Sequence, residues 1–517
     1  MLKDGYALRL TRALKYTHWA ETRYYDETGT ANEGPHEVPL YAEVGLLSRN
    51  IIIQGSADSD APNLFGATVF LHSEGDESLF ADPTLTLTLT LTLNLTAVLH
   101  SEGDESLVAR LSWVELRRAG QSFRVGRYPL HFHMIGNVRR SYVRYCSIHH
   151  TFNRAVTLHG INYLRIEYNV VFNVMGHALF IEDGIEHKNI FWYNLAILAK
   201  QSNALLNTDL TPALFWITNP DNTLVGNVAI GSQSYGFWYM AEPAGVVDLI
   251  NFQGRIRSDE LRHLGTCPSG EPILKFEKNK AASNSRYGLR VFANTGESLL
   301  GRERPCEPPS ANNSYLPSVF KDFLAVRNKK VGAIFSGKVA KVKLQGFVVA
   351  DNAVAGIEMP AAQGAGLFGE WGDNVIEDAL VVGSMRFNRT FDIDQEPTWG
   401  VGISTPAYNR LMIRNVVFIN FHCCFPAVGP MAKAKFQKHG GGYETRLEKI
   451  SFIDSDFRVM WDWAHEGVMV RRARVDARIG AHIGARIEAR LGPWHTTHTM
   501  DELMTPYLAC LLASERR

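Results

Sequence analysis

Short runs of β-branched and aromatic residues recur every 23 to 25 residues from about residue 105 to about residue 455. The runs end in Asn or Gly; Tyr145 and Tyr168 are 23 residues apart, and Asn328 and Asn352 are 24 apart. Helical spacing of apolar residues is nearly absent. Short strands at this spacing predict an all-β parallel β-helix with long loops, whose coils hydrogen-bond at about 4.8 Å. A propeller would need about 40 to 45 residues per blade, whereas a β-sandwich stays open as an alternative.

The nonapeptide LHSEGDESL occurs at 71–79 and again at 99–107, on either side of an alternating Leu/Thr tract. It does not occur a third time, so it is not the repeat unit of the fold. We interpret it as a duplication that flanks a low-complexity insert, with a surface hairpin as the alternative. The sequence then divides into an N-terminal β segment with the first coils (1–70), the insert (71–107), the parallel β-helix (108–467) and an atypical basic tail (468–517).

The 517 residues include 53 basic and 53 acidic side chains. This balance creates no global field that would attract nucleic acid or anionic lipid, so no nucleic-acid partner is expected. No stretch approaches the roughly 20 apolar residues that cross a bilayer, and the N-terminal residues lack the apolar run of a signal peptide. Neither a membrane span nor a signal peptide is therefore expected in this chain. Three Asn-x-Ser/Thr sequons are candidate glycosylation sites: Asn94, Asn312 and Asn388.

Five segments align along one face of the predicted β-helix. They are LHFH (130–133), VTLH (156–159), LFIE (179–182), FWIT (215–218) and FWYM (237–240). The first and third residues of each segment are expected to point into the core, and the second and fourth to form two outward columns. The first column holds His131, Thr157, Phe180, Trp216 and Trp238, and the second holds His133, His159, Glu182, Thr218 and Met240.

Three rings of the first column, Phe180, Trp216 and Trp238, predict a binding surface, because contiguous exposed apolar side chains generally mark one. Flat rings spaced along a groove suit sugar rings, so a polysaccharide is the predicted partner. The alternative is that a loop, for which 241–272 is the candidate, covers the rings and makes them a second small core. Two candidate partners for a uronate carboxylate, unless they pair with acidic neighbours, are Arg127 and Arg154.

The second column and the residues after it bring imidazoles and carboxylates together. These residues are His133, His159, Glu182, Asp183 and Glu186. Hydrolysis of a glycosidic bond needs one protonated and one ionised group across the substrate, so His133, His159, Glu182 and Asp183 are candidate catalytic residues. The same set also suits a divalent cation, of which zinc would prefer the histidines and calcium the carboxylates. The alternative is a polar ladder whose members only hydrogen-bond to one another.

Five longer segments carry a family resemblance. They are AEVGLLSRNIIIQG (42–55), GRYPLHFHMIG (126–136), SYVRYCSIHHTFNRAVTLHG (141–160), NVMGHALFIEDGIEHKN (173–189) and FWITNPDN (215–222). The sequence resembles fibrocystin-L, the cell migration-inducing hyaluronan-binding protein and the cell-surface hyaluronidase, from about residue 10 to 467. The resemblance implies a right-handed, single-stranded parallel β-helix of an extracellular or cell-surface protein. It also implies that some members bind and depolymerise hyaluronan, whereas fibrocystin-L-like members are coat or receptor proteins.

These features together predict a β-helix protein that binds a hyaluronan-like glycan, with glycoside hydrolysis left open. One alternative is a non-catalytic coat or receptor segment of the fibrocystin-L type. The other is a polysaccharide lyase, which would need a calcium site and a basic residue beside the C5 proton of a uronate. The sequence requires no cofactor, and a divalent cation such as calcium is the one candidate.

Overall fold

The computed structural model describes most of the predicted β-helix. The described residues are 20–26, 34–60, 62–73, 96–101, 107–202, 207–241, 268, 272–293, 318–336, 342–359, 374–383, 400–405, 411–422, 426–430 and 445–459. The chain forms two compact units, residues 1–44 and 45–517. The three sequons, most of the Leu/Thr tract and the basic tail lie outside the described residues, so the predictions made for them stay predictions.

The first unit contains one antiparallel strand pair. Strands β1 (Ala20–Tyr25) and β2 (His36–Tyr41) pair so that Ala20 lies opposite Tyr41. The Thr22 hydroxyl and the Tyr41 hydroxyl are 2.6 Å apart and hydrogen-bond across the pair.

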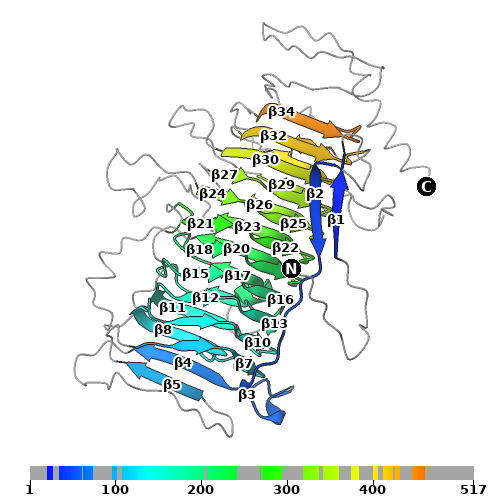
Figure 1. Cartoon of the computed structure of the whole chain (residues 1–517). Coiled ribbons are helices and arrows are strands. Elements are labelled where there is room, and N and C mark those ends of the chain that lie inside the picture. Colours follow the sequence, from blue (N-terminus) through cyan, green and yellow to red (C-terminus); the bar gives the residue numbers. More distant parts are fainter. Residues whose placement is uncertain are drawn as a thin grey trace, which may run out of the picture. The chain divides into compact units, whose positions relative to one another are not determined.

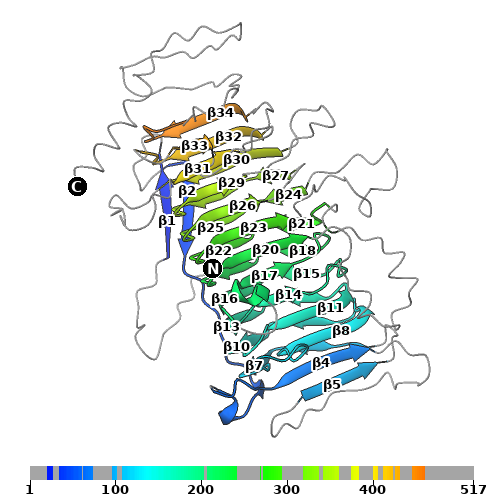
Figure 2. The ribbon, with the colours of Figure 1, turned by 180° about the vertical axis from the view of Figure 1, so that it is seen from behind.

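Each full coil of the second unit consists of three short strands (Figures 1 and 2). One coil contains β9 (Tyr142–Arg144), β10 (Ser147–His149) and β11 (Val156–Asn162), and the next contains β12 (Arg165–Glu167), β13 (Val170–Met175) and β14 (Leu179–Ile181). Every strand pairs in parallel with its counterpart one coil further on: β9 with β12, β10 with β13 and β11 with β14. The predicted parallel β-helix is therefore confirmed, and its strands form three faces that we call A, B and C.

The strands of each face follow one another along the axis of the second unit. Face A contains β6 (Arg110–Ser112), β9, β12, β15 (Ile190–Trp192), β18 (Thr223–Val225), β21 (Lys275–Glu277), β24 (Ser318–Lys321) and β27 (Val342–Gln345). Face B contains β3 (Ile51–Gln54), β7 (Val114–Arg117), β10, β13, β16 (Leu195–Lys200), β19 (Val228–Ile230), β22 (Lys280–Ala282), β25 (Leu324–Val326) and β28 (Val348–Ala350). Three longer strands continue both of these faces: β30 (Asn374–Val382), β32 (Leu411–Ile419) and β34 (Thr445–Ile453).

Face C is a separate sheet of twelve strands. It contains β4 (Thr68–Ser73), β5 (Thr96–Ser101), β8 (Leu130–Asn137), β11, β14, β17 (Ala213–Ile217), β20 (Tyr235–Ala241), β23 (Tyr287–Ala293), β26 (Val331–Ser336), β29 (Ala355–Glu358), β31 (Val401–Thr405) and β33 (Val428–Pro430). The helical elements of the described residues are two short 3₁₀ turns, η1 (Ala57–Ser59) and η2 (Asn207–Leu210). No helix in the described ranges is long and apolar enough to cross a bilayer.

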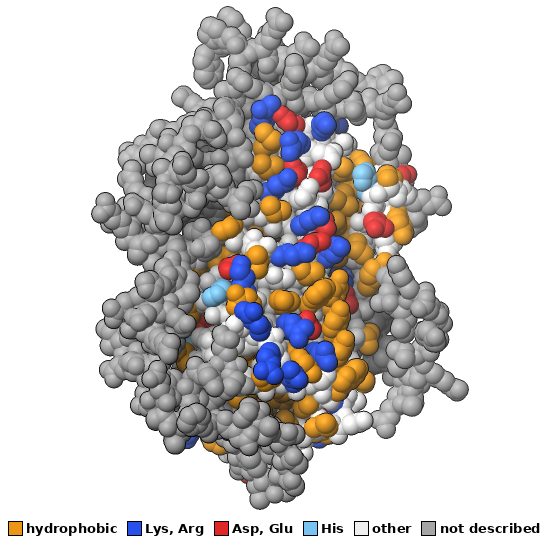
Figure 3. Space-filling view, turned by 60° about the vertical axis from the view of Figure 1, so that its left-hand side comes forward, with side chains coloured by type: hydrophobic (Ala, Val, Ile, Leu, Met, Phe, Trp, Pro, Cys, Tyr) orange, Lys and Arg blue, Asp and Glu red, His pale blue; other side chains and the backbone are white. Residues whose placement is uncertain are grey.

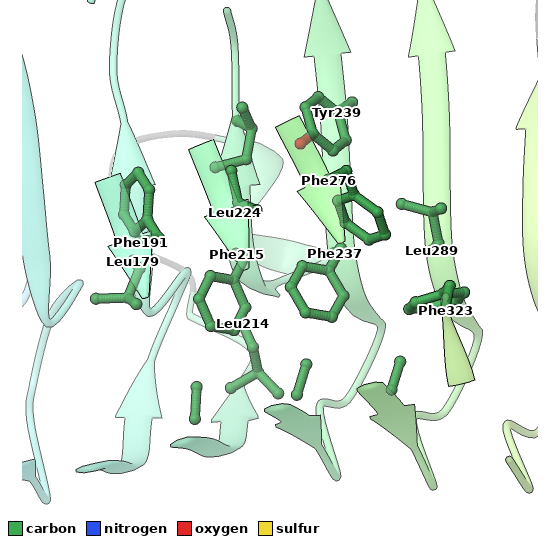
Figure 4. Close-up of a cluster of buried hydrophobic side chains, with 14 of the residues drawn as sticks. Leu179, Phe191, Leu214, Phe215, Leu224, Phe237, Tyr239, Phe276, Leu289 and Phe323 are labelled. Carbon is green, nitrogen blue, oxygen red and sulfur yellow. The ribbon is translucent and has the colours of Figure 1, made fainter. Parts of the chain in front are cut away.

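The core fills the space that the three faces enclose. Inward residues of successive coils stack on one another; the rings of Phe215 and Phe237, for example, lie 4.6 Å apart and nearly parallel (Figure 4). Buried asparagines turn the corners, as predicted. In one ladder, Asn169, Asn194, Asn227 and Asn279 pass side-chain hydrogen bonds of 3.0, 3.0 and 3.1 Å from one coil to the next. A second ladder contains Asn284, Asn328 and Asn352.

The predicted register of face C is confirmed. Thr157 pairs with His131 on one side and with Phe180 on the other, and Trp216 pairs with Phe180 and Trp238. The residues expected to point inward, such as Phe132, belong to the buried core. The alternation of inward and outward residues was thus sufficient to align five coils, because a shift by one residue would expose every inward side chain.

The first three residues of the two copies of the duplicated segment, 71–73 and 99–101, lie side by side in face C. Strand β5 pairs with β4 in parallel, with Thr96 opposite Thr68 and Ser101 opposite Ser73. On its other edge β4 pairs with β8, so β5 is the last strand of this sheet. Strands β4 and β5, on either side of the Leu/Thr tract, are therefore consecutive parallel rungs and not the two arms of an antiparallel hairpin.

Candidate functional site

Three successive rungs of face C bring imidazole and carboxylate groups together. His131 lies on β8, His159 lies on β11, and Glu182 follows β14 directly. His159 Nδ1 is 3.5 Å from Glu182 Oε2, and His131 Nε2 is 4.0 Å from the same oxygen. On its other side, His159 Nε2 is 2.7 Å from Asp183 Oδ2. We call His131, His159, Glu182 and Asp183 the imidazole–carboxylate cluster.

Of the four predicted catalytic residues, three belong to this cluster and His133 borders it. The ring of His133 lies 4.6 Å from that of His159 and nearly perpendicular to it. His131 was missed because it belongs to the first outward column, whereas the predicted site was assembled from the second. The aligned segments placed His131 on the rung before Thr157, and this position was the sequence signal that could have identified it. The catalytic role of these residues stays a prediction.

Glu186 has a structural role beside the cluster. Its carboxylate accepts backbone N–H bonds from Gly160 at 2.8 Å, Gly184 at 2.8 Å and Asp183 at 3.3 Å, and the side chain is fully buried. Burial, and then the charge of Asp183, raise its pKa to about 7. Because the carboxylate oxygens of Glu186 accept these three backbone N–H bonds, Glu186 stabilises the loop that positions Asp183.

The cluster carries opposite charges at close range. Burial lowers the pKa of His159, but the hydrogen bond to Asp183 and the charge of Glu182 outweigh it and raise the pKa to about 9. Burial raises the pKa of Glu182, although His159 and Arg154 partly oppose this. The cluster therefore holds a cationic imidazole between two carboxyl groups.

The same cluster contains a possible set of metal ligands. One ligand atom each from His131, His159 and Glu182 lie within 4.8 Å of one another, and this is the one such group of three in the described parts of the chain. Two imidazole nitrogens suit zinc and other transition metals, whereas calcium takes oxygen ligands.

The predicted aromatic surface is wrong, because the rings are buried. Phe180, Trp216 and Trp238 are only 3%, 5% and 5% exposed. Their rings pack against one another, with centroids 5.8 Å apart for the first pair and 4.6 Å for the second. With Ala213, Tyr235 and Met240 they form a second small core, which was the alternative reading of this column. The proposed covering loop, 241–272, lies almost entirely outside the described residues.

Arg154 is also not available to a ligand. It is 1% exposed, and its guanidinium forms a bidentate ion pair with Asp209, at 3.2 Å from Nε to Oδ1 and 2.8 Å from Nη2 to Oδ2. It also lies 3.7 Å from the centre of the Phe180 ring. Asp209 lies in the 3₁₀ turn η2 and not in a repeating strand, so the 23- to 25-residue spacing of the coils could not reveal it as the partner of Arg154. Arg127 is half-buried before β8, and its predicted contact with a uronate stays a prediction.

Exposed aromatic residues occur instead at the corner between faces A and B. Trp113, Tyr145, Tyr168 and Tyr193 follow β6, β9, β12 and β15 directly, each with a positive φ between 51° and 61°. Their rings stack in order with centroids 5.0, 5.3 and 5.7 Å apart and planes within 15° of parallel. We call these four residues the aromatic ladder. Trp113, Tyr168 and Tyr193 are 57%, 44% and 45% exposed.

Five arginines lie on or directly before the face A strands that lead into the aromatic ladder, and we call them the arginine group. They are Arg110 on β6, Arg144 on β9, Arg165 on β12, and Arg139 and Arg140 before β9. Within the described residues, none of the five forms an ion pair with a carboxylate. Figure 3 shows the side of the β-helix on which Lys and Arg side chains gather in a band beside hydrophobic ones.

Four basic residues further along face A form ion pairs with acidic neighbours. Lys275 pairs with Glu277 at 3.3 Å, and Arg446 pairs with Glu448 at 2.6 Å. Lys343 and Arg414 both contact Glu377. The arginine group thus stands out on its face by the local excess of positive charge.

Comparison with known proteins agrees with this fold. Residues 101–289 match the family described as CEMIP beta-helix. This region is a CEMIP-type β-helix. Fibrocystin-L of Mus musculus is 32% identical over 484 residues, which cover 90% of this chain and 10% of the relative. The cell surface hyaluronidase CEMIP2 of Homo sapiens is 29% identical over 413 residues, covering 71% of this chain and 27% of the relative.

A third relative has a binding activity in its name. The cell migration-inducing and hyaluronan-binding protein of Homo sapiens is 28% identical over 410 residues, covering 71% of this chain and 28% of the relative. Among solved structures, the catalytic domain of a GH87 alpha-1,3-glucanase aligns at a TM-score of 0.34 and 10% identity, covering 74% of this chain and 61% of that one. The chain spans about a tenth of the length of the fibrocystin-L relatives it matches.

Proposed function

We propose that this chain binds an acidic glycan of the hyaluronan type along face A, at the aromatic ladder and the arginine group. The proposal depends on one observation: four stacked aromatic rings lie at the ends of face A strands, and three of these strands, together with the residues before β9, carry five arginines that have no carboxylate partner among the described residues. Exposed apolar area of this kind is typical of binding surfaces. Guanidinium groups bind carboxylates through paired, charge-assisted hydrogen bonds.

The geometry favours a linear ligand. Outward positions of β6, β9 and β12 present Arg110, Arg144 and Arg165, and the one acidic side chain among them is Glu167. Rungs repeat at about 4.8 Å, so a polyanion that runs along the axis meets a basic or aromatic side chain at each step. The names of two relatives refer to hyaluronan or its cleavage, which supports an acidic polysaccharide as the partner.

The test compares two arginines of face A that have no carboxylate partner with one arginine that has such a partner. We expect the double variant Arg144→Gln/Arg165→Gln to bind immobilised hyaluronan oligosaccharides at least about tenfold more weakly than the unaltered chain, because each lost contact is worth roughly 1 kcal/mol. The control is Arg446→Gln, since Arg446 already pairs with Glu448, and its affinity should stay unchanged. Unchanged affinity in the double variant, or equal binding of a neutral glycan, would contradict the proposal.

Hydrolysis is a second candidate function, and the imidazole–carboxylate cluster favours it. Glu182 and Asp183 lie on either side of His159, so proton donors and acceptors are close together on face C. Incubation with hyaluronan should then yield shorter chains without unsaturated ends, and Glu182→Gln should abolish the cleavage. Unsaturated ends would indicate a lyase, and binding without cleavage would leave a receptor or coat segment. We also propose a cell-surface or extracellular location, as the name of the hyaluronidase relative suggests.

A further inference from the structure

We infer that His131, His159 and Glu182 form a binding site for a divalent transition-metal ion, with zinc as the best fit. This site lies on face C and is independent of glycan binding by face A. Two of the three separations between ligand atoms are close to those that zinc requires, and the third is no more than 4.8 Å. Tetrahedral zinc with bonds of about 2.0–2.1 Å places its ligand atoms roughly 3.4 Å apart. The observed distances of 3.5 and 4.0 Å to Glu182 Oε2 need only small side-chain adjustments.

The second nitrogen of each imidazole is held in the way that metal-binding histidines usually are. His131 Nδ1 lies 3.0 Å from the carbonyl oxygen of Gly126, which can only accept, so Nδ1 carries the proton. His159 Nε2 lies 2.7 Å from the Asp183 carboxylate and donates to it. Such contacts fix the tautomer and direct the other nitrogen at the metal.

A cation also resolves an electrostatic problem at the centre of the cluster. When both imidazoles are neutral, as metal binding requires, these tautomers direct the lone pairs of His131 Nε2 and His159 Nδ1 toward Glu182 Oε2, which is itself an acceptor. A proton on one imidazole bridges only one of the two pairs. A single metal ion contacts all three atoms at once.

The scaffold keeps the ligands in place. The three residues come from consecutive rungs of one sheet, and rigid strands position metal ligands better than loops do. His131 is 2% exposed, whereas the side chains of His159 and Glu182 are 20% and 16% exposed. Two nitrogen ligands make calcium, the candidate ion from the sequence, a poor fit.

The experiment uses chelator-treated full chain and titrates it with zinc, with calcium and with cobalt as separate probes. We expect one zinc ion per chain whose binding is lost in Glu182→Gln, a nearly isosteric change, and in His159→Ala. Bound cobalt should show the visible absorption of a four-coordinate site. Asp183→Asn, which removes the negative charge that supports His159, should weaken zinc binding by about 10–100-fold.

The matched control is His422→Ala. His422 lies 3.4 Å from Asp454 and 3.1 Å from Asp456, so it is an imidazole beside two carboxylates, with no second histidine among the described residues around it. Zinc should bind this variant as it binds the unaltered chain, and should raise the melting temperature of both but not of Glu182→Gln. Zinc that persists in every variant would come from elsewhere, such as His495 and His498. Equal zinc binding by Glu182→Gln and the unaltered chain, or preference for calcium, would overturn the inference.

Discussion

Whether an outward residue of a coil contacts solvent depends on what lies over it. Trp192 on face A and Trp216 on face C both point away from the main core, yet Trp192 is 41% exposed and Trp216 is 5% exposed. The alternation of the strands predicts only the direction of a side chain. Whether another part of the chain then covers that side chain cannot be predicted from the alternation. The predicted sugar-binding surface was misplaced because its rings belong to such a covered second core.

Trp216→Ala should therefore destabilise the protein. Removal of a buried indole leaves a cavity, and we expect the free energy of unfolding to fall by about 3–5 kcal/mol. Trp192→Ala on the exposed side of face A is the matched control, with an expected change within about 1 kcal/mol. Urea denaturation followed by circular dichroism measures both values. Similar small changes in the two variants would show that Trp216 is not a core residue.

Glu358 is a half-buried carboxyl group whose charge opposes folding. Burial raises its pKa from 4.5 to about 6. Below pH 4.5 the group is neutral in both the folded and the unfolded state; above pH 6 the folded state bears the cost of a buried charge. The free energy of unfolding is therefore highest, as far as Glu358 is concerned, below pH 4.5, and this contribution is lost as the pH rises through 6.

Glu358→Gln should then stabilise the protein in a pH-dependent way. At pH 7.5 we expect an increase in the free energy of unfolding of at most about 2 kcal/mol, and at pH 4 almost none. Thermal melts of both proteins across this range measure the difference. A constant difference at all pH values would show that the effect does not come from the charge.

The repeating elements were predictable to the extent that each coil repeats the same local chemistry. The corner asparagines and the 24-residue spacing of Gly332 and Gly356 were visible in the sequence, and the structure gives the glycines a physical reason. A Cβ on Gly332 would lie 2.5 Å from the carbonyl oxygen of Gly356, so no side chain fits between these rungs. Contacts between columns, such as His131 with Glu182, depend on side-chain direction and were missed.

Asparagine ladders should matter most at interior positions. Asn227 donates to Phe191 O at 2.8 Å and to Asn279 Oδ1 at 3.1 Å, and it accepts from the backbone N–H of Asn194 at 3.0 Å. Asn227→Ala leaves these buried groups without partners, at about 1–3 kcal/mol for each group. Asn352→Ala, at the partly exposed end of the second ladder, should cost about 1 kcal/mol because water replaces the lost contacts. Equal costs in urea denaturation would contradict a cooperative ladder.

At the scale of the whole molecule, the absence of net charge conceals a strongly uneven surface. The 53 basic and 53 acidic residues cancel in number. On face A, however, Lys343 and Arg414 form ion pairs with Glu377, whereas no member of the arginine group forms an ion pair with a carboxylate among the described residues. The balance of charges in the sequence predicts no global electrostatic attraction, but the pairing of each arginine depends on which coils become neighbours.

The proposed glycan site therefore predicts a dependence on both salt and ligand length. Salt screens surface charges over about 8 Å at physiological ionic strength, so affinity for hyaluronan oligosaccharides should fall as salt is added. The double variant Arg144→Gln/Arg165→Gln should respond less steeply, because fewer charge contacts remain to be screened. Affinity should rise with oligosaccharide length until the ligand spans the four rungs from Trp113 to Tyr193, and then level off. Surface plasmon resonance over a length series at two salt concentrations measures both trends. Affinity that is independent of salt, or that does not change with length, would show that the ligand does not follow the aromatic ladder.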